Sequence, residues 1–170
     1  MSMVNVAGKN ATTKLSNIDD DMIQPNAVDL RVEKFLKILP TPFKMSQDNT
    51  KTLRKTEEVI PDENGYFHLD VGDYEVVAEN DVSVGEDEAG LIIVRSSYNR
   101  SGLFLSSGVF DSGYNGKVIF VLHNEVGPAE IQKGSRIGQY LSWKAESLKQ
   151  YNGSYGFGTN DDIKYGKKNL

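Results

Sequence analysis

The sequence predicts an all-β domain that folds as a barrel or a jelly roll. From residue 66 to about residue 144, short apolar segments alternate with turns rich in Gly, Asn and Asp, which is typical of such folds. The chain shows no internal repeat with a period of about 20 to 50 residues, so a repeat array is not indicated. Its 170 residues are enough for one domain with its own core.

The composition is that of a globular protein without covalent cross-links. Hydrophobic residues make up 38% and charged residues 25% of the chain. The net charge of −5 argues against a nucleic-acid partner, although a few local Arg and Lys side chains can still bind phosphate. The absence of cysteine excludes disulfides, thiolate metal sites and a cysteine nucleophile. With only His68 and His123, the chain predicts no His-based metal site.

Hydropathy gives no sign of a membrane partner. No run of residues approaches the ~18 apolar residues of a membrane helix. The first 21 residues also lack the apolar centre of a signal peptide. We therefore expect a cytoplasmic protein.

Along the chain, the predicted elements fall into a domain over residues 1–148 and a tail over residues 149–170. The domain begins with a polar arm, residues 1–22, which is expected to form a short helix or irregular structure. "VDLRVEKFLKIL", residues 28–39, has an alternation that predicts a strand, with a helix as the competing interpretation. Residues 40–65 form a long excursion that ends in an Asp-Glu-Asn-Gly turn. The tail is rich in Gly, Asn and Tyr, supplies little core and is expected to be flexible.

Two segments carry side chains that suit phosphate binding. "RSSYNRSGL", residues 95–103, follows an apolar run and combines two arginines with three serines. "KGSRIGQYL", residues 133–141, combines a glycine turn with Arg136 and the lone polar residue Gln139. Taken singly, each segment is equally typical of a polar surface turn.

Two aspartates stand in unusual surroundings. Asp29 lies between apolar neighbours in "NAVDLRV", so it either faces solvent on a strand or is buried with partners, because an unpaired buried charge is very costly. Asp111 lies with Tyr114 in the glycine-rich "GVFDSGYNG", residues 108–116. The aspartate of such a turn often hydrogen-bonds to its own backbone. Its other interpretation is an acid presented beside a small pocket together with the phenol.

In their order along the chain, five segments resemble the motifs of trimeric dUTPases and the related dCTP deaminases. They are "NAVDL", "RSSYNRSGL", "GVFDSGYNG", "KGSRIGQYL" and "GSYGFGTN", and the resemblance covers roughly residues 24–160. It implies a distorted jelly-roll barrel and a homotrimer whose active sites lie at subunit interfaces. The tail of one chain would then close over a site built by the others.

The resemblance also implies an activity, the hydrolysis of dUTP to dUMP and pyrophosphate, which lowers dUTP and supplies dUMP for dTMP synthesis. Asp111 matches the aspartate that orients the water attacking the α-phosphate, and Tyr114 the tyrosine that packs on the deoxyribose. Phe157 matches the tail aromatic that stacks on uracil. Mg²⁺ would be bound through the substrate triphosphate, with few protein ligands. The remaining matched positions are Arg95, Ser96, Ser97, Arg100 and Gln139 for the phosphates, Gly108 in the base pocket, and Asp29 and Arg136 in support.

Two departures from the family pattern keep alternatives open. Val121 stands where deaminases carry a catalytic glutamate, and valine cannot shuttle the proton to the departing ammonia, so dUTP hydrolysis is favoured. Asn152 stands near the position of the usual tail arginine. None of the nearby lysines matches that position; these are Lys149, Lys164, Lys167 and Lys168. The alternatives are a dCTP deaminase, a bifunctional deaminase and dUTPase, a dCTP pyrophosphatase, and a non-catalytic regulatory trimer that binds nucleotide.

Overall fold

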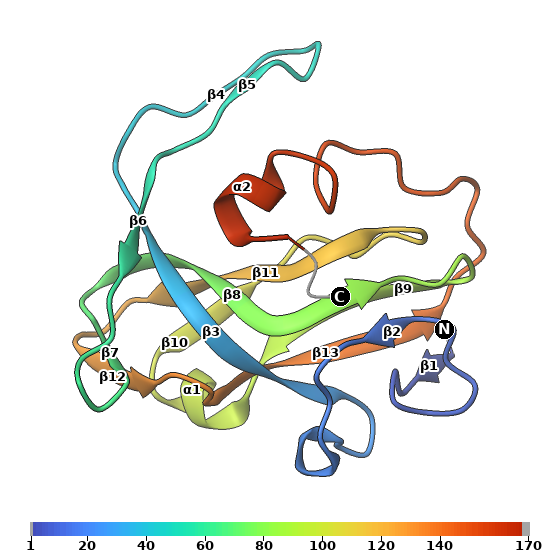
Figure 1. Cartoon of the computed structure of the whole chain (residues 1–170), viewed down its shortest axis with the longest axis horizontal. Coiled ribbons are helices and arrows are strands. Elements are labelled where there is room, and N and C mark those ends of the chain that lie inside the picture. The colour runs from blue at the N-terminus through green and yellow to red at the C-terminus, as the bar shows by residue number, and fades with distance from the viewer. Residues whose placement is uncertain (1, 168–170) are drawn as a thin grey trace.

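The structure, a computed structural model, describes residues 2–167 and confirms the all-β prediction (Figure 1). The strands are β1 (Met3–Val4), β2 (Lys14–Leu15), β3 (Val28–Ile38), β4 (Lys44–Met45), β5 (Lys51–Thr52), β6 (Thr56–Val59), β7 (Tyr66–Leu69), β8 (Gly72–Ser83), β9 (Glu88–Val94), β10 (Leu103–Ser106), β11 (Asn115–Asn124), β12 (Ala129–Gln132) and β13 (Arg136–Lys144). The helical segments are the 3₁₀ turn η1 (Asp20–Met22), α1 (Ser96–Arg100) and α2 (Asp161–Tyr165). Within residues 2–167, no helix combines the length and the apolar character needed to cross a membrane.

Strand β3 is the element around which the main sheet curls. Its first half pairs with β13, where Leu30 lies opposite Gly138, and its second half pairs with β8, where Phe35 lies opposite Val76. The register shifts between Val32 and Lys34, and such an irregularity bends a strand and increases its twist. The strand interpretation of residues 28–39 is therefore confirmed. A helix would have left the edges of β8 and β13 without partners.

All pairs in the main sheet are antiparallel, in the order β1-β13-β3-β8-β11-β10. Strand β9 pairs with β13, β6 with β3, and β2 with β8, so the sheet folds over itself as a jelly-roll-like sandwich. The enclosed core contains an aromatic group in which Phe35 meets Phe67 and Tyr74 edge to face at centroid distances of 5.1 and 6.2 Å. Burying each such ring stabilises the fold by roughly 1.5–3 kcal/mol.

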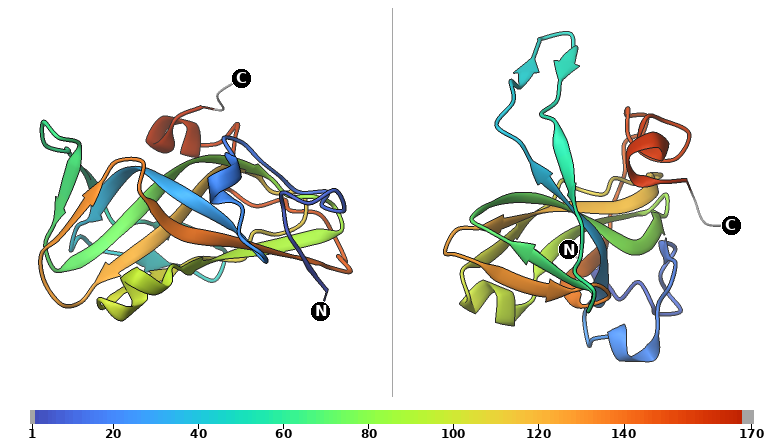
Figure 2. Two further views of the ribbon diagram at one scale, coloured as in Figure 1. Left: turned by 90° about the horizontal axis from the view of Figure 1, so that it is seen from below. Right: turned by 60° about the vertical axis from the view of Figure 1, so that its left-hand side comes forward.

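Residues 40–65 form an arm rather than part of the body. The small hairpin β4–β5 extends from the end of β3 and stands clear of the sheet (Figure 2). The chain returns through β6, and the predicted turn at residues 62–65 closes with a hydrogen bond from Gly65 N to Asp62 O of 2.9 Å. Gly65 has φ of 81°, the left-handed conformation that glycine adopts without strain. The N-terminal arm is largely irregular, with β1 on β13 and β2 on β8.

The C-terminal segment runs back over its own chain. Helix α2 lies on the outer side of the sheet, above β8 and β11 (Figure 1). Lys164 and Tyr165 fix it there, since Lys164 Nζ lies 2.7 Å and the Tyr165 hydroxyl 3.0 Å from the carboxylate of Glu75 on β8. The tail thus has defined contacts in a single chain. The proposed domain boundary at residue 148 and the mobility of the tail remain predictions.

Candidate active site

Asp29 forms the centre of a polar cluster at one end of β3. Its side chain is fully buried, and it accepts hydrogen bonds from Gln139 Nε2 at 2.9 Å and from Gln24 Nε2 at 3.3 Å. Arg95 Nε and Arg136 Nη1 each lie 3.5 Å from the same carboxylate. Of the two interpretations of Asp29, the structure therefore supports burial with partners, and four of the sequence-predicted residues meet here.

The strand register brings this cluster together. Gln139 lies directly opposite Asp29 in the β3–β13 ladder, so the two side chains share one face. Arg95 follows the end of β9 and donates through Nη1 to the Arg136 carbonyl at 2.9 Å. The arginine side chains are about one third exposed, at 32% and 34%. The two guanidinium groups share the buried Asp29, and Arg136 also lies 4.0 Å from the exposed Asp21. Their partly exposed N–H groups can bind an anion such as phosphate.

Helix α1 extends this positive site. Ser96 and Ser97 form its first turn and are exposed, as is Arg100 at its end. The first N–H groups of a helix have no partner within it, so they are available to an oxyanion beside the arginines. The sequence-predicted phosphate residues therefore all lie at or next to one surface.

The stretch "GVFDSGYNG" forms a loop that ends in a tight turn. Phe110 pairs with Gly90 of β9 through two main-chain hydrogen bonds, and Tyr114 N donates to Asp111 O at 3.0 Å with Gly113 at φ of 83°. The carboxylate of Asp111 is exposed and accepts no hydrogen bond from residues 2–167, so the backbone bond expected of a turn aspartate is not formed. An acid without such a bond remains available to a water molecule or a substrate.

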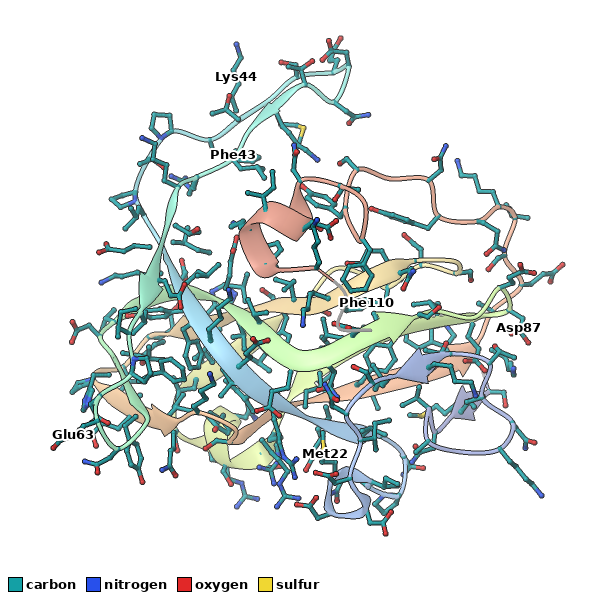
Figure 3. The ribbon with its side chains drawn as sticks, in the orientation of Figure 1. Met22, Phe43, Lys44, Glu63, Asp87 and Phe110 are labelled. Carbon is teal, nitrogen blue, oxygen red and sulfur yellow. The ribbon has the colours of Figure 1, made fainter. Side chains whose placement is uncertain are left out.

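Tyr114 lines a cleft with a volume of about 590 Å³. Its ring packs edgewise against Phe110 and Tyr151 at centroid distances of 5.6 and 5.2 Å. Burial raises the pKa of the Tyr114 phenol, which therefore stays neutral. Gly108 and Phe43 of the arm line the same cleft, and Figure 3 shows Phe43 and Phe110 on two sides of α2. This aromatic cleft is suited to a planar base.

Asp111 lies outside that cleft. It lines a second cavity of about 600 Å³ together with Ser112 and residues 147–152 of the tail. Tyr151 borders both cavities and separates them. The expectation that Asp111 and Tyr114 face one small pocket therefore does not hold within a single chain.

The glycines of "GSYGFG" bring the tail into contact with β11. Phe157 N donates to Asn115 O at 2.9 Å, and Gly156 has φ of 104°. A Cβ atom on Gly156 would lie 2.5 Å from Asn115 O, which no side chain tolerates. Phe157 is half-buried beside this contact. Glycine at position 156 is therefore needed for the close approach.

The lysines near the missing tail arginine have different surroundings. Lys149 and Asn152 line the cavity of Asp111, whereas Lys164 is bound to Glu75. Lys167 is exposed, and Lys168 lies outside the described residues. Lys149 is thus the tail cation that shares a cavity with the candidate acid.

Sequence reasoning missed Glu75. It lies opposite Val121 in the β8–β11 ladder, and both residues line the aromatic cleft. A carboxylate therefore stands one strand away from the position that deaminases fill with glutamate. The alternation of β8 indicates which residues share a face, but not which strand lies beside it, so no local signal identified Glu75.

The phosphate cluster and the acid lie far apart within one chain. Phe110 is fixed to Gly90, and Arg95 follows five residues later on the extended strand β9. At about 3.3 Å per residue this spacing is roughly 16 Å. Asp111 therefore lies towards the start of β9, whereas Arg95 and its cluster lie at the end of that strand.

Comparison with known proteins identifies the family of the chain. Residues 5–144 match the sequence model of the dCTP deaminase-like family. The chain belongs to the dUTPase and dCTP deaminase superfamily. It is 31% identical over 141 residues to a probable deoxyuridine 5′-triphosphate nucleotidohydrolase of Methanococcoides burtonii, covering 80% of this chain and 82% of that protein.

Proteins named as dCTP deaminases are also similar to the chain. A dUMP-forming dCTP deaminase of Streptomyces coelicolor is 26% identical over 143 residues, covering 81% of this chain and 75% of that protein. Among solved structures, the 2′-deoxycytidine 5′-triphosphate deaminase of Agrobacterium tumefaciens superposes with a TM-score of 0.58 at 18% identity. The match covers 76% of this chain and 41% of that one, and it supports the fold.

Proposed function

We propose that the protein is a dUTP diphosphatase that hydrolyses dUTP to dUMP and pyrophosphate, so that it lowers dUTP and supplies dUMP for dTMP synthesis. The observation that carries the proposal is the Asp111 carboxylate, which is exposed and accepts no hydrogen bond from the described residues. A protein that only binds nucleotide has no need of such an acid. The relatives named as deoxyuridine triphosphate nucleotidohydrolases support the same activity.

In this proposal Asp111 accepts a proton from a water molecule as its oxygen attacks the α-phosphorus. The bond from the α-phosphorus to the bridging oxygen breaks, and pyrophosphate leaves. Arg95, Arg136 and Gln139 hold the phosphates, with Ser96, Ser97 and Arg100 at the edge of the same site. Catalysis is then mainly positioning and charge stabilisation, as is general for phosphoryl transfer. Tyr114, Gly108 and Phe157 would enclose the base and the deoxyribose.

Mg²⁺ fits this site as a companion of the substrate. The carboxylate at the centre of the phosphate cluster, Asp29, is already engaged by Arg95, Arg136 and Gln139, so it is not free to ligate a cation. Mg²⁺ commonly keeps several waters and binds through substrate phosphates. When bound, it would offset charge on the triphosphate.

The active site is proposed to form between chains of a homotrimer. The placement of Asp111 and the arginine cluster towards opposite ends of β9 supports this, since one triphosphate needs both. A closed C₃ ring lets each chain supply its acid to one neighbour and its arginines to another. Light scattering should give three times the mass of one chain, and a fully active monomer would contradict the shared site.

Product analysis tests the activity. The protein is incubated with dUTP or dCTP and Mg²⁺, and the nucleotides are separated. Wild type should yield dUMP and pyrophosphate from dUTP. Asp111→Asn should keep the fold and the trimer but lose about 10²- to 10⁴-fold in turnover, because the amide cannot accept the proton. Turnover unchanged in Asp111→Asn would remove the assigned role, and no dUMP from wild type would remove the function.

One observation favours a second activity, the deamination of dCTP. Glu75 lies in the aromatic cleft beside Val121 and, once released by Lys164 and Tyr165, offers a carboxylate for proton transfer. If it acts in this way, dCTP should yield uracil nucleotides in wild type and cytosine nucleotides only in Glu75→Gln. Formation of dCMP alone in both proteins would exclude deamination and leave a pyrophosphatase.

A further inference from the structure

Three polar side chains on neighbouring strands form a chain of hydrogen bonds beside the aromatic cleft. Ser106 Oγ lies 2.8 Å from His123 Nε2, and His123 Nδ1 lies 2.7 Å from Asp73 Oδ1. The strands are β10, β11 and β8, which are consecutive in the sheet, and His123 lies opposite Asp73 in the ladder. Because all three side chains come from paired strands, the rigid sheet fixes their arrangement.

The chemistry of the three groups decides the direction of the hydrogen bonds. The carboxylate of Asp73 can only accept, so the proton of the neutral imidazole lies on Nδ1. Nε2 is then an acceptor, and the Ser106 hydroxyl must donate its proton to it. The histidine is therefore placed to take the serine proton. Both distances fall within the range of about 2.6–3.2 Å that is typical of an activated nucleophile and its base.

Ser106 is exposed, and it lines the cleft of about 590 Å³. Val109, Phe110 and Ile119 supply apolar lining to the same cleft. Ser107 and Gly108 follow the serine and also line the cleft. Their main-chain N–H groups form no hydrogen bond within residues 2–167, so they are available to a developing oxyanion.

We propose that Ser106, His123 and Asp73 form an activated serine site that hydrolyses carboxylic esters with a small apolar acyl group. Ser106 Oγ attacks the carbonyl carbon while its proton moves to His123 Nε2. The carbon–oxygen bond to the alcohol breaks, and the alcohol leaves with that proton. Water, deprotonated by His123, then releases the acid and restores the serine. Asp73 is a positioning residue that fixes the imidazole tautomer. The proposal does not depend on the nucleotide activity.

Covalent labelling tests the site without any knowledge of a natural substrate. Wild type is treated with an alkyl fluorophosphonate, and the labelled residue is located by peptide mass spectrometry; hydrolysis of p-nitrophenyl butyrate is followed in parallel. EDTA is included because donor atoms of Asp73, His123 and Glu125 lie within 4.8 Å of one another, and a bound cation would occupy the imidazole. The variants are Ser106→Ala, His123→Gln and Asp73→Asn. The control is Ser83→Ala, an exposed serine at the end of β8 that does not line the cleft.

Wild type should take up one label, at Ser106, and Ser106→Ala should take up none. His123→Gln should slow labelling about 100-fold or more, through loss of the base. Asp73→Asn should slow it about tenfold or more, because the amide permits the wrong tautomer. Ser83→Ala should react at the wild-type rate. Thermal melts establish that each variant is folded, and the two substitutions His123→Gln and Asp73→Asn give independent tests. The proposal would be overturned if wild type took up no label, if the label lay at another residue, or if His123→Gln and Asp73→Asn both reacted at the wild-type rate.

Discussion

The pH dependence of stability should be governed in part by Glu88. This side chain is fully buried on β9, where Oε1 accepts from Thr12 N at 2.9 Å and Lys144 Nζ at 2.8 Å, and Oε2 accepts from Thr13 N at 2.8 Å. Burial alone would raise the pKa of the carboxyl. The hydrogen bonds from Lys144 and the two threonines outweigh burial and lower the pKa from 4.5 to about 2. Glu88 thereby fastens the N-terminal arm to the sheet.

The contribution of Glu88 to stability follows from the difference between its unfolded and folded pKa. A carboxyl whose pKa is lowered in the folded state stabilises the fold fully above its unfolded pKa, and that stabilisation is lost as the pH falls through the folded pKa. The stabilisation is therefore lost over the pH range between 4.5 and about 2. At about 1.4 kcal/mol per pKa unit, the contribution of Glu88 is on the order of 3 kcal/mol.

The test compares urea unfolding of wild type and Glu88→Gln from pH 7 to pH 2 at one protein concentration, since assembly makes stability depend on concentration. Glu88→Gln should be about 3 kcal/mol less stable at pH 7, and the difference should shrink to near zero at pH 2. The matched control is Glu86→Gln, an exposed neighbour whose curve should parallel that of wild type. A difference between Glu88→Gln and wild type that stays constant with pH would refute the reasoning.

Three further predictions concern the candidate active site. Asp29→Asn should lower the free energy of unfolding by about 1.5–3 kcal/mol and raise KM for dUTP, because both arginines lose their buried anchor. The exposed Asp20→Asn should change neither quantity in urea and steady-state assays. Gly156→Ala, or truncation after Gln150, should reduce turnover on dUTP while the melting temperature hardly moves, because the tail acts as a lid; unaltered kcat and KM would contradict this. Tyr114→Ala should raise kcat/KM for UTP relative to dUTP by opening space beneath the sugar, and an unchanged ratio would make Tyr114 a packing residue only.

Much of the fold could be predicted from local features. The spacing of turn residues between short apolar segments indicated an all-β domain, and the alternation over residues 28–39 favoured the strand that β3 proves to be. Gly65 and Gly113 were recognisable as turn positions, and both have positive φ in the structure. These features can be recognised in the sequence because backbone sterics and side-chain alternation act over only a few residues.

The candidate site was only partly predictable. The order of the motifs pointed to Asp29, Arg95, Arg136 and Gln139, and the structure brings these four together. Alternation left the orientation of Asp29 undecided, because burial depends on the pairing of β3 with β13. The expected single pocket for Asp111 and Tyr114 was not found within one chain, since the two side chains line different cavities.

By itself, the sequence determined the class of fold, the family and the residues whose side chains are suited to bind phosphate. Only the tertiary structure decided which of them meet. Glu75 beside Val121, the chain from Ser106 through His123 to Asp73, and the placement of the acid and the arginines towards opposite ends of β9 all depend on strand register. Register is set when distant strands close into one sheet, and it places residues as far apart in sequence as Asp73 and His123 directly opposite each other. No local pattern contains that information, because the pairing is chosen by the packing of the whole core.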